Sequence, residues 1–323
     1  MTELGPDTTT DEVLDGTDLT GQVMLVTGAS SGLGLETARS LAAHGATVVM
    51  AARDKDRGEQ ALAAVRAGSF PEADLELRLV DLGSLTSIRR FAEGLLADRD
   101  RLDVLIANAG VMACPLGHTS DGFEMQFGTN HLGHFLLVEL LAPLVVAGAP
   151  SRLVVLSSAG HKLADVDLDD PQWTRGAYDK WQAYGRAKTA NVLFATEFDR
   201  RYKNRGVRAF AVHPGTIVTE LGRHLTEEDI AILRGHGTTD AEATPRPRGL
   251  RRWKSVEAGA ATTVWAATST SLDGIGGRYL EDCGIGEPDD DPAAERGHRS
   301  YATDPQRAAS LWSMSATLVG LDT

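Results

Sequence analysis

Tyr184 and Lys188 are the residues in this 323-residue chain whose types and spacing best suit proton transfer. They stand four positions apart in the helix-patterned segment AYGRAKTANVLFATEF (183–198), and of the five tyrosines only Tyr184 is followed by a lysine at that spacing. Residues four apart share one helix face, so a phenol and an ammonium are expected side by side. A fixed cation should lower the phenol pKa from its reference of about 10. The pair predicts a general acid/base, or else a surface pairing without function.

A glycine-rich turn, VTGASSGLG (26–34), joins a buried apolar run to a helix pattern. Gly28, Gly32 and Gly34 stand where the chain must turn sharply and bring bare backbone close to a ligand, and amides at a helix N-terminus bind anions. The alternative is a tight turn without a ligand. The place between strand and helix favours a dinucleotide pyrophosphate, although the spacing Gly-x3-Gly-x-Gly departs from GxGxxG.

Six short runs of Val, Leu, Ile and Ala predict buried strands, because they are almost continuously apolar instead of alternating. They lie at 22–27, 47–52, 75–80, 103–108, 152–157 and 207–213, with helix-length segments between them; a helix at about 255–270 and a GGRYL strand follow. This alternation predicts an α/β fold with a single Rossmann-type, doubly wound parallel sheet of about seven strands in the order 3-2-1-4-5-6-7, covered by helices on both faces.

The domain organisation follows from composition. Residues 1–20 are expected to be a disordered acidic tail. One domain is expected over 21–285, with a Pro-, Gly- and Arg-rich loop or lid at 214–254 that is longer than an ordinary connection. Residues 286–323 are expected to be an extension that opens with an acidic loop and closes with a terminal helix packed on the outside.

Composition and charge exclude several classes of function. A net charge of −13 argues against nucleic-acid binding. No apolar run approaches the roughly 18 residues that cross a bilayer, and the N-terminus lacks an export signal, so no membrane span and a cytoplasmic location are expected. The basic cluster RPRGLRRWK (246–254) is interpreted as a solvated loop, and an anion-binding role is the alternative.

The cysteines and histidines give no metal-binding pattern. Cys114 and Cys283 are interpreted as reduced thiols, because neither belongs to a CxxC pair. Four histidines, 131, 134, 161 and 213, are interpreted as core or loop residues, since none belongs to a set of three ligands. No metal is expected.

Seven motifs in this order resemble the short-chain dehydrogenase/reductase family over roughly residues 20–283. They are TGASSGLG (27–34), DL (81–82), NAG (108–110), Asn130 in TNHLGHF, SS (157–158), YGRAK (184–188) and HPGTIVT (213–219). The stretches MAARDKDRGE, NHLGHFLL and GGRYLEDCGIGEP are similar to the retinol-dehydrogenase-like branch. Ser158 and Tyr184 are 26 residues apart, about twice the usual family spacing, and the extra segment looks like the insertion of that branch.

The resemblance implies a catalytic set of Asn130, Ser158, Tyr184 and Lys188. Tyr184 would exchange the proton, with its pKa lowered by Lys188 and by the positive oxidised nicotinamide. Ser158 would bond the reacting oxygen and stabilise its charge. Ser158 is preferred to Ser157 because the family pattern places the catalytic serine second. Lys188 would also bond the nicotinamide ribose, and Asn130 would hold a water that links Lys188 to solvent.

The resemblance also implies a nicotinamide dinucleotide. The acidic position of NAD-binding members falls on Ala52, and Arg53 follows it, so NADP(H) is favoured over NAD(H) because a guanidinium suits the 2′-phosphate. Asp54 leaves an alternative, since its carboxylate could bond a ribose hydroxyl. The residues expected at the cofactor are Gly28, Ser30, Ser31, Gly32, Leu33, Gly34, Arg53, Asp81, Leu82, Asn108, Ala109, Gly110, Tyr184, Lys188, Pro214, Gly215, Thr216 and Thr219.

The expected function is an NADP(H)-dependent oxidoreductase that transfers a hydride between nicotinamide and an alcohol or carbonyl substrate. The small-molecule substrate is expected to be apolar and to lie under segment 214–254, near Val111, Met112, Ile217, Leu221 and Trp253. Two alternatives stay open: a light-dependent carbon–carbon double-bond reductase resembling protochlorophyllide reductase, and a non-catalytic NADP-sensing regulator. The helices at 122–147 and 178–204 commonly pair between subunits in relatives, which leaves a homodimer or homotetramer open.

Overall fold

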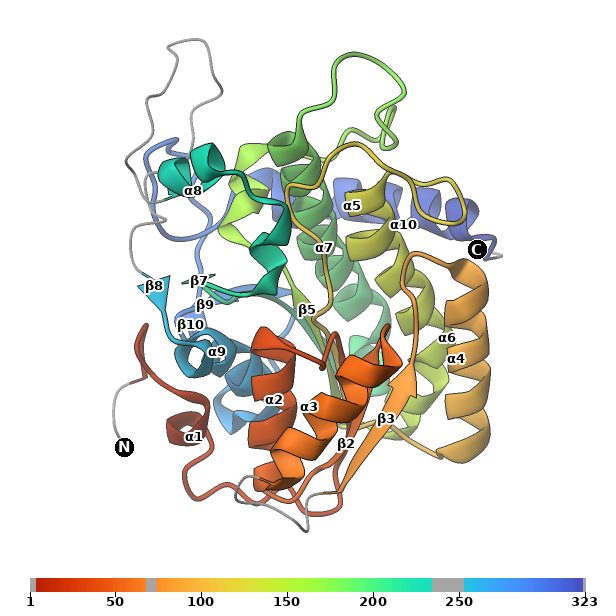
Figure 1. Cartoon of the computed structure of the whole chain (residues 1–323), viewed down its shortest axis with the longest axis vertical. Helices are drawn as coiled ribbons and strands as arrows, with labels where there is room; N and C mark the ends of the chain where they lie inside the picture. Colours follow the sequence, from red (N-terminus) through yellow and green to blue (C-terminus); the bar gives the residue numbers. More distant parts are fainter. Residues whose placement is uncertain (1–3, 68–73, 234–252, 322–323) are drawn as a thin grey trace.

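A computed structural model describes residues 4–67, 74–233 and 253–321. Its centre is an eight-stranded sheet in the order β10-β9-β6-β5-β4-β1-β2-β3 (Figure 1). β1 to β6 and β9 are parallel to one another, and β10 runs antiparallel to β9 at the edge of the sheet. Their bounds are Val23–Thr27 (β1), Thr47–Ala52 (β2), Leu75–Leu79 (β3), Val104–Ala107 (β4), Ser151–Leu156 (β5), Val207–His213 (β6), Arg278–Glu281 (β9) and Gly284–Ile285 (β10).

This topology confirms the expected doubly wound sheet. The six runs predicted as strands and the GGRYL segment form β1 to β6 and β9, in the expected order. The eighth strand was not predicted, because the two residues of β10 are too few to carry an apolar pattern.

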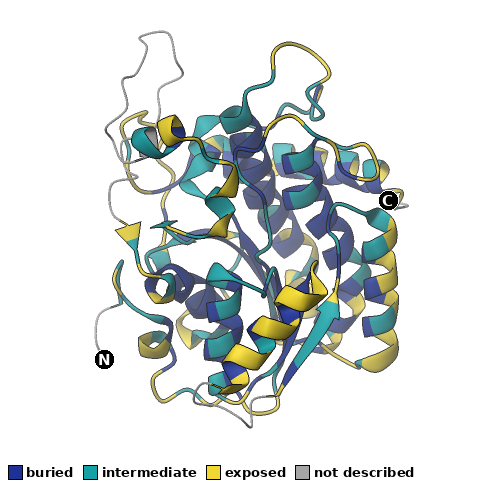
Figure 2. Cartoon of the chain, viewed as in Figure 1, coloured by how far each residue is buried: buried dark blue, intermediate teal, exposed yellow. Residues whose placement is uncertain are grey.

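Two layers of helices cover the sheet. α2 (Gly32–Ala43), α3 (Lys55–Ala67) and α9 (Val256–Thr268) pack on one face, and α4 (Leu85–Asp98), α6 (Gly133–Ala147), α7 (Lys180–Tyr202) and α10 (Pro305–Val319) pack on the other. Within β1, Leu25 points into the second layer while Met24 and Val26 point into the first. Because both faces are buried, the strands read as continuous apolar runs. Figure 2 shows these buried strands, with exposed residues on the outer side of α3.

The long helix expected at 122–147 is interrupted. It consists of α5 (Met125–Phe127), a π-helical turn at Gly128–Leu132 that contains Asn130, and α6. Single π-turns inside helices occur often at functional sites. Contrary to the expectation from apolar runs, the stretch Met125–Ala147 is long and apolar enough to cross a membrane by length and composition, but 72% of its most apolar window is buried inside the protein. That burial is typical of a core helix.

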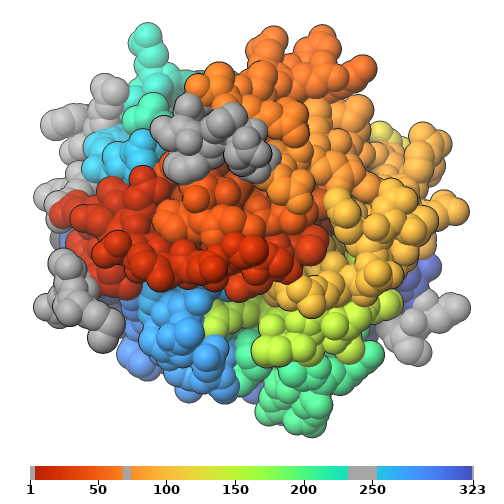
Figure 3. All heavy atoms as spheres, turned by 90° about the horizontal axis from the view of Figure 1, so that it is seen from below, coloured from red at the N-terminus to blue at the C-terminus, as the bar shows by residue number. Residues whose placement is uncertain are grey.

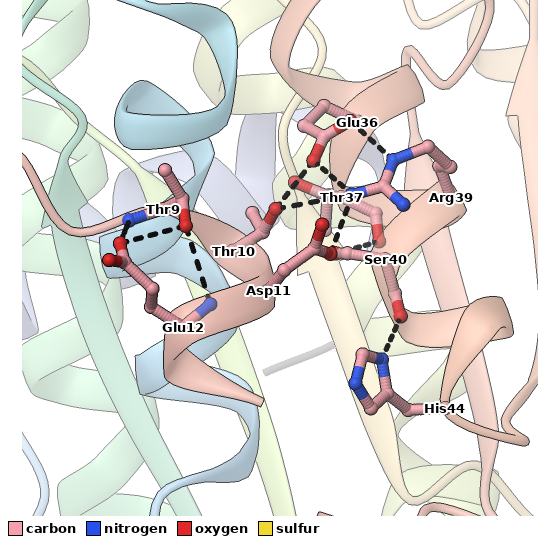
Figure 4. A network of polar contacts seen from close by, with 9 residues as sticks. All are labelled: Thr9, Thr10, Asp11, Glu12, Glu36, Thr37, Arg39, Ser40 and His44. Atoms are coloured by element: carbon pink, nitrogen blue, oxygen red, sulfur yellow. Dashed lines mark hydrogen bonds and ion pairs between the residues drawn. The ribbon is translucent and has the colours of Figure 1, made fainter. Parts of the chain in front are cut away.

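The N-terminal residues differ from the expected disordered tail. Residues 4–20 lie against the domain, where they form α1 (Thr10–Val13) and bury Leu14 and Leu19 next to α2 and α9. The Thr10 hydroxyl donates to Glu36 of α2 at 2.5 Å, and Asp11 pairs with Arg39 of α2 at 2.8 Å (Figure 4). Figure 3 shows the red N-terminal segment as a band beside the blue segment that follows residue 255. Among its acidic side chains, Glu12 caps α1 and Asp11 forms an ion pair.

The segments that follow β6 line the cavity at the carboxyl ends of the parallel strands. β7 (Thr216–Ile217) pairs with β8 (Trp253–Lys254), and a 3-10 turn at Glu220–His224 and α8 (Glu227–Leu233) stand between them. Most of the basic cluster 246–254, and the middle of the expected lid, lie outside the described residues. At the C-terminus, α10 packs Trp312 onto Phe135 and Phe194, so it covers part of α6 and α7, the helices whose pairing between subunits the sequence left open.

Candidate active site

A cavity of about 720 Å³ opens at the carboxyl ends of β1, β2, β4, β5 and β6. Every residue that the sequence assigned to the cofactor lines this cavity, and so do Ser158 and the five residues expected near the substrate. Asn130 does not line it, because it is fully buried behind Val111. The structure thus brings together residues that are up to 225 positions apart, from Gly28 to Trp253.

The glycine turn leaves room for a diphosphate. Gly28 and Gly32 have φ values of +68° and +54°, which side chains rarely tolerate. A Cβ on Gly34 would lie 2.4 Å from the carbonyl oxygen of Gly28, so only glycine allows this close approach. Ser31, the N-cap of α2, makes no side-chain capping bond, and the first amides of α2 therefore stay available to an anion. These features fit a dinucleotide.

Tyr184 and Lys188 lie side by side on α7, as predicted, and each is only 4% exposed. The ammonium nitrogen lies 5.7 Å from the centre of the Tyr184 ring and donates to the carbonyl of Leu156 at 3.0 Å. Burial lowers the pKa of Lys188 to about 8. Burial also raises the pKa of Tyr184 to about 12, against a lowering effect of the hydrogen bond with Ser158. The predicted fall in the Tyr184 pKa depended on the positive oxidised nicotinamide as well as on Lys188; in the protein alone, burial dominates and raises the pKa.

The two adjacent serines at the end of β5 have different surroundings. Ser157 is buried and donates its hydroxyl to the carbonyl of Lys188 at 2.8 Å, which anchors α7 on the sheet. Ser158 faces the cavity, and its Oγ accepts from the Gly160 amide at 3.0 Å. A Cβ on Gly160 would lie 2.8 Å from the Tyr184 ring, so a glycine is needed there to let the phenol approach Ser158.

Asn130 contacts the segment that follows β4. Its side chain accepts from the Val111 amide at 2.8 Å and donates to the Val111 carbonyl at 2.9 Å. Its own carbonyl lies 3.0 Å from Nδ1 of His134, whose Nε2 lies 2.9 Å from the Thr27 hydroxyl. Thr27 Oγ1 in turn accepts from the amides of Asn108 and Ala109. His134 is a core histidine, as interpreted, and it joins the π-turn to the strand that precedes the glycine turn.

Arg53 lies exposed at the end of β2, and Arg57 on the first turns of α3 lines the cavity beside it. Arg57 was missed, although its position four residues after Arg53 at a helix start is a usable signal. It forms an ion pair with Glu220, whose carboxylate also bonds the Ser31 hydroxyl. Asp54 accepts from the Arg57 amide at 3.0 Å, so its carboxylate caps α3. The carboxylate of Glu220 is therefore an anionic group at the rim of the cavity, beside Ser31.

The comparisons with known proteins agree with this geometry. A family model described as short chain dehydrogenase matches residues 22–230. Retinol dehydrogenase 13 of Homo sapiens is 40% identical over 302 residues, which cover 94% of this chain and 86% of that protein. Retinol dehydrogenase 14 of Homo sapiens is 40% identical over 317 residues, 93% of this chain and 87% of that protein.

Solved structures show the same relationship. The crystal structure of an uncharacterised protein from Mycobacterium paratuberculosis superposes with a TM-score of 0.72 at 33% identity and covers 98% of both chains. A protein described as a short chain dehydrogenase/reductase family protein superposes with a TM-score of 0.60 at 28% identity, over 82% of this chain and 96% of its own. The chain therefore belongs to the short-chain dehydrogenase/reductase family, in its retinol-dehydrogenase-like part, and is an oxidoreductase with a nicotinamide cofactor and a small-molecule substrate.

Proposed function

We propose that this protein is an NADP(H)-dependent oxidoreductase that interconverts an apolar alcohol and its aldehyde or ketone, with Tyr184 as the general acid/base. The observation that carries the proposal is the meeting of Tyr184, Lys188 and Ser158 in the same cavity that the glycine turn lines. A phenol, an ammonium and a hydroxyl around one point suit proton transfer to a carbonyl oxygen.

The bound nicotinamide would supply the hydride for carbonyl reduction, or accept it from the alcohol. In reduction, Tyr184 gives its proton to the substrate oxygen and becomes a phenolate. Ser158 bonds the same oxygen and also the phenol, so it stabilises negative charge on either side of the transfer. Lys188 stabilises the phenolate and, being held by the Leu156 carbonyl, stays within reach of a cofactor ribose. In oxidation, the phenolate takes the proton back.

The arginines at the end of β2 support NADP(H). Arg53 has no hydrogen bond or ion pair among the described contacts. Arg57 forms an ion pair with Glu220, and a phosphate can take the place of that carboxylate. The 2′-phosphate is a dianion, and a guanidinium fork matches its oxygens.

The walls of the cavity beyond Tyr184 support an apolar substrate. The apolar side chains that line the cavity include Met112, Leu163, Trp181, Leu225, Ile230 and Trp253. The names of the two human relatives, both retinol dehydrogenases, point to an alcohol of the same apolar character.

The test is reduction of apolar aldehydes and ketones with NADPH or NADH, followed at the nicotinamide absorbance band. We expect turnover with NADPH and a loss of kcat of at least about 100-fold in Tyr184→Phe, because general acid catalysis contributes that much or more. Tyr202→Phe, which changes another tyrosine of α7, is the matched control and should keep wild-type kcat. Full activity in Tyr184→Phe would contradict the proposal.

A further inference from the structure

His161 lies directly behind Ser158 and is fully buried. Its Nδ1 is 2.7 Å from the Ser158 carbonyl oxygen, and its Nε2 is 3.2 Å from the backbone nitrogen of Arg299. A backbone N–H can only donate, so Nε2 accepts and the ring proton stands on Nδ1, from which it is donated to Ser158. Both ring nitrogens are thus in use, and the two partners fix one neutral tautomer.

The backbone of His161 joins two further segments. Its carbonyl oxygen accepts from the Tyr301 hydroxyl at 2.7 Å and from the Thr189 hydroxyl at 3.1 Å. Thr189 follows Lys188 on α7, whereas Arg299 and Tyr301 belong to the C-terminal extension. The extension therefore bonds His161 through the Arg299 amide and the Tyr301 hydroxyl. His161 in turn bonds Ser158 and, through Thr189, α7, the helix of Tyr184.

The part of the C-terminal extension that contacts His161 is held by further hydrogen bonds. The Arg299 guanidinium donates to the carbonyls of Asp289 and Asp291 at 2.8 and 2.6 Å. The Tyr279 ring lies 5.0 Å from the His161 ring, centre to centre, and fills the space beside it. Burial, together with the positive charge of Lys162 and the neighbouring His213 and His298, lowers the pKa of His161 to about 3. The ring therefore stays neutral and keeps its single donor.

We propose that His161 is a positioning residue for Ser158, and that Arg299 and Tyr301 of the C-terminal extension complete the active site by holding it. The inference deepens the proposed function and rests on it for its kinetic part. The Ser158 carbonyl accepts from Nδ1 of His161 at 2.7 Å and from the His161 backbone N–H at 3.0 Å, and the Ser158 Oγ accepts from the Gly160 amide. The two backbone bonds lie within one turn, whereas the His161 ring also joins that turn to Arg299. Without the ring the turn as a whole can shift relative to Tyr184, and a displacement of about 1 Å can cost about 100-fold in rate.

Three substitutions at one position separate the two ring bonds. Asn places an amide near the position of Nδ1, so His161→Asn keeps a donor for Ser158; Gln reaches the position of Nε2, so His161→Gln keeps only the acceptor for Arg299. His161→Phe keeps the bulk and neither bond. We expect kcat to fall about 10- to 100-fold in His161→Phe and in His161→Gln at nearly constant KM for NADPH. In His161→Asn, which keeps the bond to Ser158 but loses the bond to Arg299, kcat should be restored only in part.

A double-mutant cycle tests whether His161 acts through Ser158. The loss of kcat that Ser158→Ala causes should be clearly smaller in the His161→Phe background than in the wild type. Tyr301→Phe should lower kcat a few-fold. Tyr279→Phe is the matched control: it keeps the ring beside His161 and removes a hydroxyl that has no hydrogen-bond partner among the described residues, so kcat should not change.

Hydrogen exchange of the peptide that covers residues 157–163 provides a readout that needs no turnover. Exchange should speed up in His161→Gln and stay slow in His161→Asn. Wild-type kcat in His161→Gln, independent effects of His161→Phe and Ser158→Ala, or unchanged exchange would each overturn the inference. A wild-type protein that reduces no carbonyl, or a fully active Tyr184→Phe, would instead overturn the proposed function, and exchange alone would then decide the role of His161.

Discussion

Arg53 is the residue on which cofactor choice is expected to depend. It lies exposed at the end of β2, and its side chain faces the cavity where a 2′-phosphate would enter. Hydrogen bonds to charged groups contribute about 1.5 to 3 kcal/mol, so Arg53→Ala should raise the Kd for NADPH about 10- to 100-fold and leave the Kd for NADH nearly unchanged. Quenching of protein fluorescence measures both constants.

The neighbouring Lys55 is the matched control for that experiment. It carries the same charge near the start of α3 but pairs with Glu59 at 3.6 Å and does not line the cavity. Lys55→Ala should bind both cofactors as the wild type does. Equal losses for NADPH and NADH in Arg53→Ala would show that Arg53 does not read the 2′-phosphate.

Glu220 is expected to compete with a bound phosphate. Its carboxylate reaches from the turn after β7 to Arg57 and Ser31, both of which line the cavity. Arg57 and Glu220 are 50% and 55% exposed, and exposed ion pairs contribute about 0 to 1 kcal/mol. Glu220→Ala should therefore lower the Kd for NADPH by no more than about fivefold. Glu227→Ala, which changes a carboxylate at the start of α8, is the control, and weaker NADPH binding in Glu220→Ala would mean that Glu220 binds the cofactor.

Among the elements, α1 and the chain around it give the clearest difference from the sequence prediction. Leu14 is fully buried against the layer formed by α2 and α9. Truncation of a fully buried leucine costs about 2 to 5 kcal/mol, so Leu14→Ala should lower the free energy of unfolding by that amount in urea titrations. Asp15→Ala, which changes an exposed neighbour, should have almost no effect. Equal stability of both variants would support the disordered tail.

The C-terminal segments contact residues that adjoin the catalytic candidates Asn130 and Ser158. The Ser315 hydroxyl on α10 lies 2.8 Å from Nε2 of His131, the residue next to Asn130. Arg299 and Tyr301 reach His161, three residues after Ser158. Apolar periodicity predicted a terminal helix on the outside, but a pattern along one segment does not reveal which distant loop its polar side chains will meet.

At the scale of the whole molecule, three buried histidines, 131, 134 and 161, and the half-buried His213 should govern the response to acid. Burial lowers the pKa to about 3 in His131 and His161 and to about 4 in His134 and His213. The unfolded chain protonates these rings near pH 6.5 while the folded chain does not, so stability is lost as the pH falls from 6.5 toward 4. Each ring adds a slope of up to about 1.4 kcal/mol per pH unit.

Urea unfolding at several values between pH 7 and 5 measures this slope. His131→Phe places a phenyl ring among Phe127, Phe135 and Phe194 and removes one titrating group. Its slope should be smaller than that of the wild type by about one proton. A stability that does not change between pH 7 and 5 would contradict the assignment of these histidines as neutral core groups.

Much of the architecture could be predicted from the sequence by itself. Strands buried on both faces leave continuous apolar runs, and the glycine turn and the Tyr184–Lys188 spacing are local patterns, because a turn and a helix face each involve residues close in the chain. The strand order, the cofactor cavity and the neighbours of Tyr184 followed from those patterns together with the family resemblance.

Only the tertiary structure decided the properties that depend on distant neighbours. The fall expected in the Tyr184 pKa depended on Lys188 and on the positive nicotinamide, whereas in the protein alone burial, which no local pattern reports, raises that pKa. The contact of Glu220 with Arg57 joins residues 163 positions apart. The hydrogen bonds of Arg299 and Tyr301 with His161 join residues 138 and 140 positions apart. Hydrogen bonds and desolvation act over a few ångströms in space, so they appear only when folding has brought such segments together.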